Sequence, residues 1–251
     1  MDKQLRDQFR YFLKDRVRQE IDFYQTDQSR GVPPPPLQKP CPADGKCIAL
    51  AAPGTWQGIS SIDLVTAIGT RRSHRNFRQE PVSLDELSFM LWATQGITRK
   101  ANEGTAFRTV PSAGCRHAFE TYLCILNVAG TAQGIYRYLP VEHQLLLETE
   151  TGNLAVRTAE AALGQTFIAR AAVTFIWTTI PHRMEWRYDI AAHKVIAIDA
   201  GHVCQNLYLA ASATSCGVCA VAAYDQQKID RLIGADGEDE FTIYLAAVGK
   251  I

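Results

Sequence analysis

Residues 196–212 read Ile-Ala-Ile-Asp-Ala-Gly-His-Val-Cys-Gln-Asn-Leu-Tyr-Leu-Ala-Ala-Ser, a stretch that is apolar on nearly every face of a helix. Such a helix must be buried, either at the centre of a domain or at a subunit interface. It forms most of a longer predicted helix, residues 191–215. Asp199, His202 and Asn206 follow at i, i+3 and i+7, so they share one side of this helix. We interpret them either as a buried polar seam or as part of a cofactor or substrate site.

Around this helix, short strands and helices follow one another without a regular βαβ repeat. This pattern is typical of an α+β fold. The segment Ser83-Leu-Asp-Glu86 is a capping box that opens one helix, and Ser60-Ser61-Ile-Asp63 resembles the start of another. Periodicity predicts strands at 119–127, 134–139, 144–148, 171–180 and 241–248, and further helices at 153–163, 183–189 and 225–233.

The first part of the chain has a different character. Residues 3–24 place apolar side chains at helical spacing among many charges, which predicts an amphipathic helix. From Ser29 the pattern gives way to a proline-rich stretch that cannot be helical. We therefore divide the chain into a helix with an extended arm, residues 1–57, and a main domain, residues 58–251. The arm is expected to lie over a surface, although a free linker is the alternative.

Charge and composition exclude several classes of protein. The 251 residues are 47% hydrophobic, enough for a packed core, and 26 basic residues balance 26 acidic ones. No net field attracts nucleic acid or an anionic membrane surface. The charged N-terminus is unlike a signal peptide, and no apolar run approaches the roughly 20 residues that span a bilayer. We expect a soluble cytoplasmic protein that binds neither nucleic acid nor membrane.

Common catalytic motifs are absent from the sequence. It contains no phosphate-binding GxGxxG after a strand, no P-loop, no HExxH and no GxSxG. The seven cysteines are an odd set, which favours reduced thiols. Cys216 and Cys219 have the spacing of a redox or metal pair, but no second pair or suitably spaced histidine accompanies them. We interpret both thiols as structural and expect no metal site.

The loop Gly69-Thr-Arg71-Arg72-Ser73-His74-Arg75-Asn-Phe77 stands out instead. Three guanidinium groups and a hydroxyl within five residues can bind a phosphate dianion and a polyol through charge-assisted hydrogen bonds. A solvated basic loop is the alternative interpretation.

Three further segments have the residue types of a cofactor site. Thr109-Val-Pro111-Ser112-Ala113-Gly114 is a turn whose backbone can approach a flat ligand. The segment Gly217-Val-Cys-Ala-Val-Ala222-Ala223-Tyr224-Asp225 ends a predicted strand in small residues, where main-chain N–H groups can face an acceptor. Lys250 follows the last predicted strand. Taken singly, these features are an ordinary turn, strand end and exposed charge.

In order and separation, the four features resemble the nitroreductase superfamily, and the resemblance covers about residues 58–250. The chain is most similar to the SagB-type branch, the relatives of azoline dehydrogenases. The segments that carry this second resemblance are Leu91-Trp-Ala-Thr-Gln95-Gly-Ile-Thr98, Pro111-Ser-Ala-Gly114 before Phe119-Glu-Thr-Tyr-Leu, Gly134-Ile-Tyr-Arg-Tyr138, and Asp199-Ala-Gly-His-Val-Cys-Gln-Asn-Leu-Tyr-Leu209.

The resemblance implies a mixed central sheet sandwiched by helices, with FMN at a homodimer interface and arms exchanged between protomers. The resemblance also implies that the basic loop, residues 69–77, holds the FMN phosphate and ribityl chain, and that a backbone N–H at the end of a strand faces flavin N5. The residues at matching positions are Arg71, Arg72, Ser73, Arg75 and Lys250 for the phosphate and ribityl chain, Pro111, Ser112, Ala113 and Gly114 against the isoalloxazine from the partner subunit, Gln95 as a polar neighbour, and Ala222 and Ala223 at N5.

The expected function is an FMN-dependent oxidoreductase, in which NAD(P)H drives reduction of a small organic acceptor. An azoline or other heterocycle dehydrogenase is the alternative, and its proton carrier would be Tyr188. Where azoline dehydrogenases resemble one another in a Lys-Tyr pair, this chain has Arg187-Tyr188, and an arginine is a poor general base. A non-catalytic flavin-binding dimer is the alternative of another class.

Overall fold

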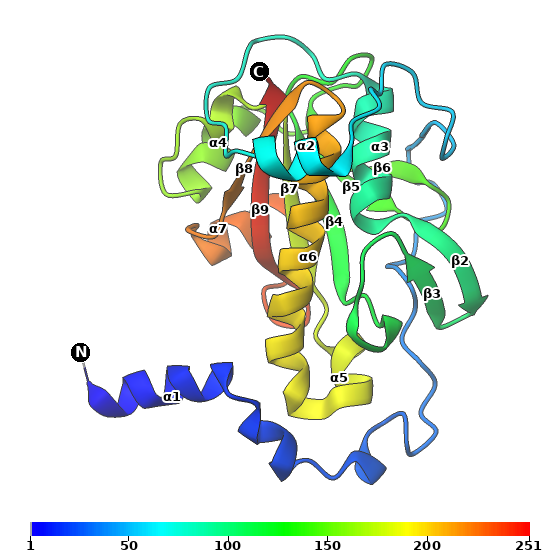
Figure 1. Cartoon of the computed structure of the whole chain (residues 1–251), viewed down its shortest axis with the longest axis vertical. Coiled ribbons are helices and arrows are strands. Elements are labelled where there is room, and N and C mark those ends of the chain that lie inside the picture. The colour runs from blue at the N-terminus through cyan, green and yellow to red at the C-terminus, as the bar shows by residue number, and fades with distance from the viewer. Residues whose placement is uncertain (1) are drawn as a thin grey trace.

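The computed structural model describes residues 2–251, so Met1 of the predicted arm lies outside it. Its centre is a seven-stranded sheet in the order β1-β6-β5-β4-β7-β9-β8 (Figure 1), and a separate hairpin pairs β2 with β3. The strands are β1 (Cys47–Ala49), β2 (Ile97–Asn102), β3 (Thr105–Arg108), β4 (Phe119–Ile125), β5 (Gly134–Leu139), β6 (Gln144–Thr149), β7 (Val173–Thr179), β8 (Cys216–Val221) and β9 (Phe241–Lys250).

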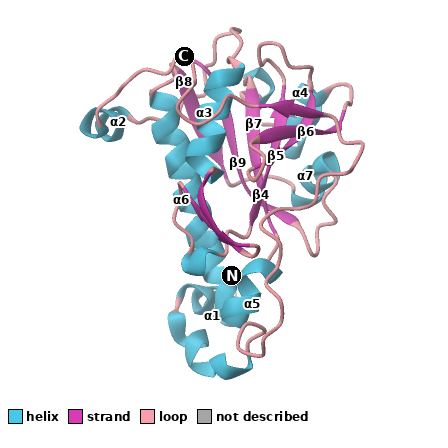
Figure 2. Ribbon diagram, turned by 90° about the vertical axis from the view of Figure 1, so that its right-hand side faces the viewer, coloured by secondary structure: helices cyan, strands magenta, loops and turns pink. Residues whose placement is uncertain are grey.

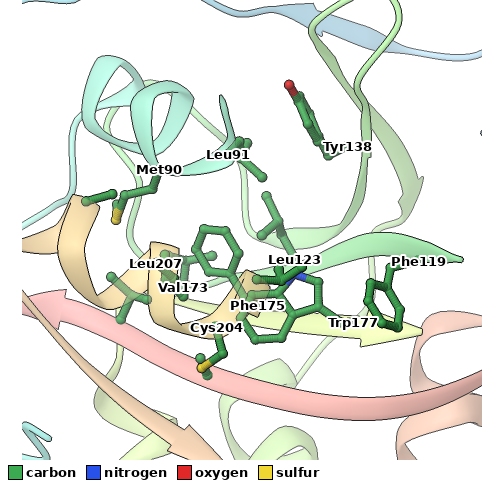
Figure 3. Close-up of a cluster of buried hydrophobic side chains, with 14 of the residues drawn as sticks. Met90, Leu91, Phe119, Leu123, Tyr138, Val173, Phe175, Trp177, Cys204 and Leu207 are labelled. Carbon is green, nitrogen blue, oxygen red and sulfur yellow. The ribbon is translucent and has the colours of Figure 1, made fainter. Parts of the chain in front are cut away.

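Helices cover both faces of the sheet, as Figure 2 shows. On one face α3 and α6 pack against apolar side chains of β4, β7 and β9, and the core there includes Phe175, Trp177 and Leu207 (Figure 3). On the other face α4 and α7 cover a second cluster. The helices are α1 (Lys3–Leu13), α2 (Leu64–Thr70), α3 (Leu84–Gln95), α4 (Leu154–Ala161), α5 (His182–Tyr188), α6 (Ala192–Ser212) and α7 (Gln226–Ile233).

The predicted α+β class is confirmed, but the sheet is not mixed. Every ladder in it is antiparallel. The crossover through α5 and α6 brings β8 back parallel to β7, yet β9 lies between the two and runs antiparallel to both. The expectation of a mixed sheet was wrong. The order of helices and strands along the sequence indicates that β7 and β8 run in the same direction, but it does not show that β9 lies between them.

Capping residues set several helix boundaries. The Ser83 capping box is present, with Glu86 and Ser83 each accepting a backbone N–H of the other residue. The preceding helix has Asp63, the last residue of the predicted start Ser60–Asp63, as its N-cap, and the Asp63 carboxylate accepts the Thr66 N–H. The N-terminal helix ends at Leu13, followed by two short 3-10 turns. It buries none of its side chains, so packing does not extend it to residue 24 as predicted.

The proline-rich arm runs along the body and is held by its backbone carbonyl groups. Arg108 donates to the Leu37 carbonyl at 2.8 Å, and Arg137 donates to the carbonyls of Lys39 and Pro40, both at 3.0 Å. Both arginines are more than 90% buried. An extended segment without internal hydrogen bonds is thereby fixed to the sheet, as expected for an arm that lies over a surface.

One buried histidine, His117, and one half-buried histidine, His143, predict that stability falls in mild acid. His143 accepts or donates at both ring nitrogens, to Tyr138 Oη at 2.7 Å and Ser88 Oγ at 2.9 Å, and burial lowers its pKa. Burial, with Arg108 and Arg116 nearby, lowers the pKa of His117 to about 3. The unfolded chain binds a proton at each imidazole more readily than the folded chain does. The free energy of unfolding is therefore highest above the unfolded pKa of about 6.5, and it decreases as the pH falls below that value.

Each histidine should lower the free energy of unfolding by about 1.4 kcal/mol for each pH unit between its unfolded and folded pKa. Urea unfolding at pH 7.5, 6.0 and 5.0 measures this slope. A free energy of unfolding that stays constant over this range would show that neither histidine is buried in its neutral form.

Candidate functional site

The basic loop lies against the edge strand β8. The His74 N–H donates to the Val218 carbonyl at 2.9 Å, and Ser73 and Val218 form an isolated parallel bridge. Tyr208 of α6 joins the two segments, because its hydroxyl lies 2.9 Å from Ser73 Oγ and accepts the Ala220 N–H at 2.9 Å. The loop, β8 and the C-terminal end of α6 are therefore held together around one tyrosine.

A pocket of about 270 Å³ opens beside this tyrosine. The Arg71 guanidinium lies over the Tyr208 ring, 5.2 Å from its centre. Gly217 forms part of the wall, and a Cβ there would come within 2.6 Å of His74 Cβ. The polar residues that line the pocket are Thr70, Arg71, Arg72, His74, Tyr208, Ser212 and Ser215.

The guanidinium groups of this loop lack carboxylate partners. Within residues 2–251, none of Arg71, Arg72 and Arg75 forms an ion pair. Arg72 donates to the carbonyls of Gly69 and Arg71, and Arg75 lies over the Phe167 ring at 5.8 Å. Unneutralised cations, hydroxyls and a glycine-walled strand are the donor set that a phosphate monoester requires, so these residues fit the phosphate and ribityl end of FMN.

The small residues after β8 lie on the same edge of the sheet. Ala222 and Ala223 are exposed and follow the last pair of the β8–β9 ladder, Val221–Leu245. Gln165 donates to the Ala223 carbonyl at 2.9 Å, and it belongs to the same connection as Phe167, which contacts Arg75. Arg75 of the loop and Ala223 of the strand end therefore contact the same connection, residues 165–167.

Lys250 and Gln95 are placed differently. Lys250 lies at the end of β9, next to the pocket, but its ammonium group donates to the Glu86 carboxylate and the Thr214 carbonyl. Gln95 is buried at the end of α3, where its Oε1 accepts a hydrogen bond from Arg108 at 2.8 Å. No hydrogen bond of the described chain joins Gln95 to the basic loop. Their proposed contacts with a cofactor stay predictions.

The segment from Pro111 to Gly114 forms a second cluster near the start of α6. The Ala113 N–H donates to Asp199 at 3.3 Å, and burial raises the pKa of that carboxyl, while its hydrogen bond with Ser112 opposes the shift. A Cβ at Gly114 would lie 2.7 Å from Arg187 Cδ and 2.8 Å from Tyr188 Oη. Asp199 and Tyr208 are nine residues apart on α6, about 13 Å along its axis. Within one chain the two clusters are therefore separate.

Apolar surface is exposed on α1, α2 and α6. On α2, Leu64, Val65 and Ile68 are 56 to 82% exposed, and Ile198 of α6 is 49% exposed. A pocket of about 630 Å³ lies between α2, α3 and α6. His202 is also exposed on α6. The sequence predicts that α6 is buried on all faces, but in the single chain one face of α6 is exposed. This face is free to contact another molecule.

The side chains of Cys216 and Cys219 lie on opposite faces of the sheet. Cys216 and Cys219 both lie on β8, and they pack into opposite core clusters, one on each face of the sheet. They therefore cannot share a metal ion or form a disulfide. In the part of the chain that the structure describes, no group of three or more potential ligands is arranged to hold a metal, and no helix is long and apolar enough to cross a bilayer.

Sequence comparison adds three findings. Residues 68–250 match the Nitroreductase family. The protein named Putative nitroreductase MJ1384 of Methanocaldococcus jannaschii is 32% identical over 194 residues, which cover 76% of this chain and 93% of that protein. Trifolitoxin-processing protein TfxB of Rhizobium leguminosarum is 32% identical over 108 residues, 41% of this chain and 29% of its own length.

The fold has a close counterpart among solved structures. A crystal structure from Ralstonia eutropha, titled as that of a putative nitroreductase, superposes with a TM-score of 0.67 at 26% identity, covering 87% of this chain and 98% of the other.

Proposed function

Because this chain belongs to the nitroreductase family of oxidoreductases, we propose that it binds FMN between the Arg71–Arg75 loop and the end of β8. In this proposal the enzyme reduces a small organic acceptor with electrons from NAD(P)H. The observation that carries it is the pocket beside Tyr208, where the guanidinium groups of Arg71 and Arg72, which form no ion pair among the described residues, meet the first residues of the edge strand β8.

Each part of the chain has a distinct task in this proposal. Arg71, Ser73 and Arg75 bind the phosphate and ribityl chain, while Ala222 and Ala223 present backbone N–H groups to the reactive edge of the ring. Such fixed donors stabilise negative charge where it develops and need no reorganisation during the reaction. Bound FMN would supply the hydride acceptor and donor that no side chain of the protein can replace.

We also propose that the working unit is a homodimer. The Pro111–Gly114 segment lies about 13 Å along α6 from the Tyr208 pocket, and in this proposal it covers the flavin held by the partner subunit. The exposed apolar residues of α2 and α6 provide surface for that contact. The partner segment would exclude water from the ring, which a single chain leaves open.

The proposal is tested by the purified protein. Denaturation should release one FMN per subunit, identified by mass and absorbance, and light scattering should give twice the mass of the chain. A protein that remains without flavin after incubation with excess FMN would refute the cofactor assignment.

Tyr208→Phe should weaken FMN binding by about tenfold while leaving the fold intact. The change removes one hydroxyl, whose hydrogen bonds hold Ser73 and the Ala220 N–H, and such bonds contribute about 1 kcal/mol each. Fluorescence titration of the apoprotein with FMN measures the dissociation constant. Tyr136→Phe is a matched control, because its hydroxyl donates to the Ala132 carbonyl beside β5, away from the loop and from β8. Equal effects of both changes would refute the role of Tyr208.

A second candidate function is favoured by the similarity to TfxB, whose name describes it as a trifolitoxin-processing protein. In this alternative the chain oxidises a heterocycle derived from a peptide, and electrons enter from that substrate and not from a nicotinamide. Tyr188 would then carry the proton, because its hydroxyl lies beside Gly114 in the segment proposed to face the ring.

Tyr188→Phe distinguishes the two reactions. If Tyr188 carries the substrate proton, the change should slow turnover of the heterocycle by about 100-fold, as expected for loss of a general acid or base. Reduction of the flavin by NAD(P)H should keep its rate. Rapid-mixing measurements of both half-reactions provide the comparison, and undiminished heterocycle oxidation would exclude Tyr188 as the proton carrier.

A further inference from the structure

Two guanidinium groups converge on Gly114. Arg116 Nε donates to the Gly114 carbonyl at 3.4 Å, and the Arg187 side chain lies where a Cβ of Gly114 would be, with Cδ and Nε within 2.8 Å of that position. Arg116 is only 8% exposed and lies over the Trp186 ring, 4.9 Å from its centre. Arg187 is half-buried and lies over the Tyr188 ring at 5.5 Å.

Neither of these cations is neutralised by the protein. Over residues 2–251, Arg116 and Arg187 form no ion pair with a carboxylate. Arg116 donates its other hydrogen bonds to Gly104 and Thr105, and Arg187 donates to the Gln28 side chain. The carboxylate of Asp199, near the same segment, is instead engaged with the Ala113 N–H.

Placing two like charges together at a partly desolvated position is unfavourable unless an anion is brought between or beside them. Burial lowers the pKa of Arg116, and the nearby charge of Arg187 lowers it further. An anion bound beside both guanidinium groups would relieve this repulsion.

We propose that Arg116 and Arg187 bind an oxyanion, a carboxylate or phosphate, on the molecule that exchanges hydride with the flavin. This inference rests on the proposed function, because the Pro111–Gly114 segment faces the ring only in the FMN homodimer. The planar guanidinium of Arg187 can hold an oxyanion through two parallel hydrogen bonds. The neighbouring Tyr188 hydroxyl is a further donor at the same place.

The substrate class that follows is a small anionic compound, and its charge has two possible sources. It belongs either to the organic acceptor, as a carboxylate, or to the nicotinamide donor, as the 2′-phosphate of NADPH. In both cases the arginine pair orients a reactant by its charged end and leaves its apolar part free to lie against the ring.

Equilibrium binding tests this without turnover. Calorimetry on the protein as purified would compare benzoate with benzamide, and NADP+ with NAD+, for the wild type, Arg187→Gln and Arg187→Lys. Arg157→Gln is the control, because it removes the same charge from α4, on the other face of the sheet. We expect wild type to prefer one anionic probe over its uncharged or less charged partner by at least tenfold, and Arg187→Gln to abolish that preference.

The pattern of losses identifies the source of the charge. If Arg187→Gln loses only the preference for benzoate over benzamide, the charge belongs to an acidic acceptor. If it loses only the preference for NADP+ over NAD+, the charge belongs to the phosphorylated donor. Partial recovery in Arg187→Lys supports a role for charge. Equal binding of charged and neutral probes by the wild type, or an equal effect of Arg157→Gln, would overturn the proposal. Absence of bound flavin would refute the proposed function separately, since the binding comparison does not depend on it.

Discussion

Changing Glu120 to Gln should lower the free energy of unfolding by about 3–5 kcal/mol, the usual cost of removing one partner from a buried ion pair. Glu120 is 2% exposed on β4, where its carboxylate accepts hydrogen bonds from Arg183 and from the Lys39 N–H of the arm. A second guanidinium, that of Arg137, lies 3.7 Å away. A neutral amide would leave Arg183 buried without its counter-charge, whereas Arg137 would keep its ion pair with Glu148.

Chemical denaturation measures this effect, and the arm gives it a second readout. Because an amide oxygen is a weaker acceptor than a carboxylate for the Lys39 N–H, limited proteolysis should cut the proline-rich segment faster in the variant than in the wild type. Glu103→Gln is the control, because Glu103 is 95% exposed in its ion pair with Lys100 and should change stability by less than about 1 kcal/mol. If Glu120→Gln lowers the free energy of unfolding by less than about 1 kcal/mol, this ion-pair network does not hold the arm against the sheet.

The double change Arg71→Ala with Arg75→Ala should weaken FMN binding at least 100-fold. Hydrogen bonds to charged groups contribute about 1.5–3 kcal/mol each, so the loss of two corresponds to a factor of about 100 or more. Neither arginine has an ion-pair partner among the described residues, and therefore their removal should cost the fold little.

Fluorescence titration of the apoprotein measures this affinity, and thermal unfolding checks the fold. Arg78→Ala serves as the control, since Arg78 follows the same loop but is paired with Glu80. If the double variant retains FMN with unchanged affinity, the loop does not hold the cofactor.

Much of the fold could be predicted because its signals are local. The strand at 134–139 has the predicted boundaries, and the Ser83 capping box and the long helix α6 are where the sequence places them. Local pattern does not report which strands become neighbours, so the insertion of β9 between β7 and β8 was missed. It also does not show that Arg137, on β5, holds an arm about 97 residues earlier in the chain.

The candidate site was found in part for the same reason. Arg71 to Arg75 form a compact basic motif that stands out in any sequence. Tyr208 was missed as a site residue, because a tyrosine in an apolar helix is ordinarily a core residue, and only the folded chain brings its hydroxyl to Ser73. Family membership decides for an enzyme over a non-catalytic dimer. The choice of reductant and substrate depends on the shape of a site built from segments far apart in the chain, which local sequence patterns do not describe.

The central claim, an FMN oxidoreductase driven by a nicotinamide, is tested most directly by mixing the purified flavoprotein with NADH or NADPH in the absence of oxygen. We predict that the flavin absorbance is lost rapidly with at least one of the two donors. Bound FMN that keeps its oxidised spectrum with both would contradict the nicotinamide-driven reaction and leave a dehydrogenase that takes electrons from its organic substrate.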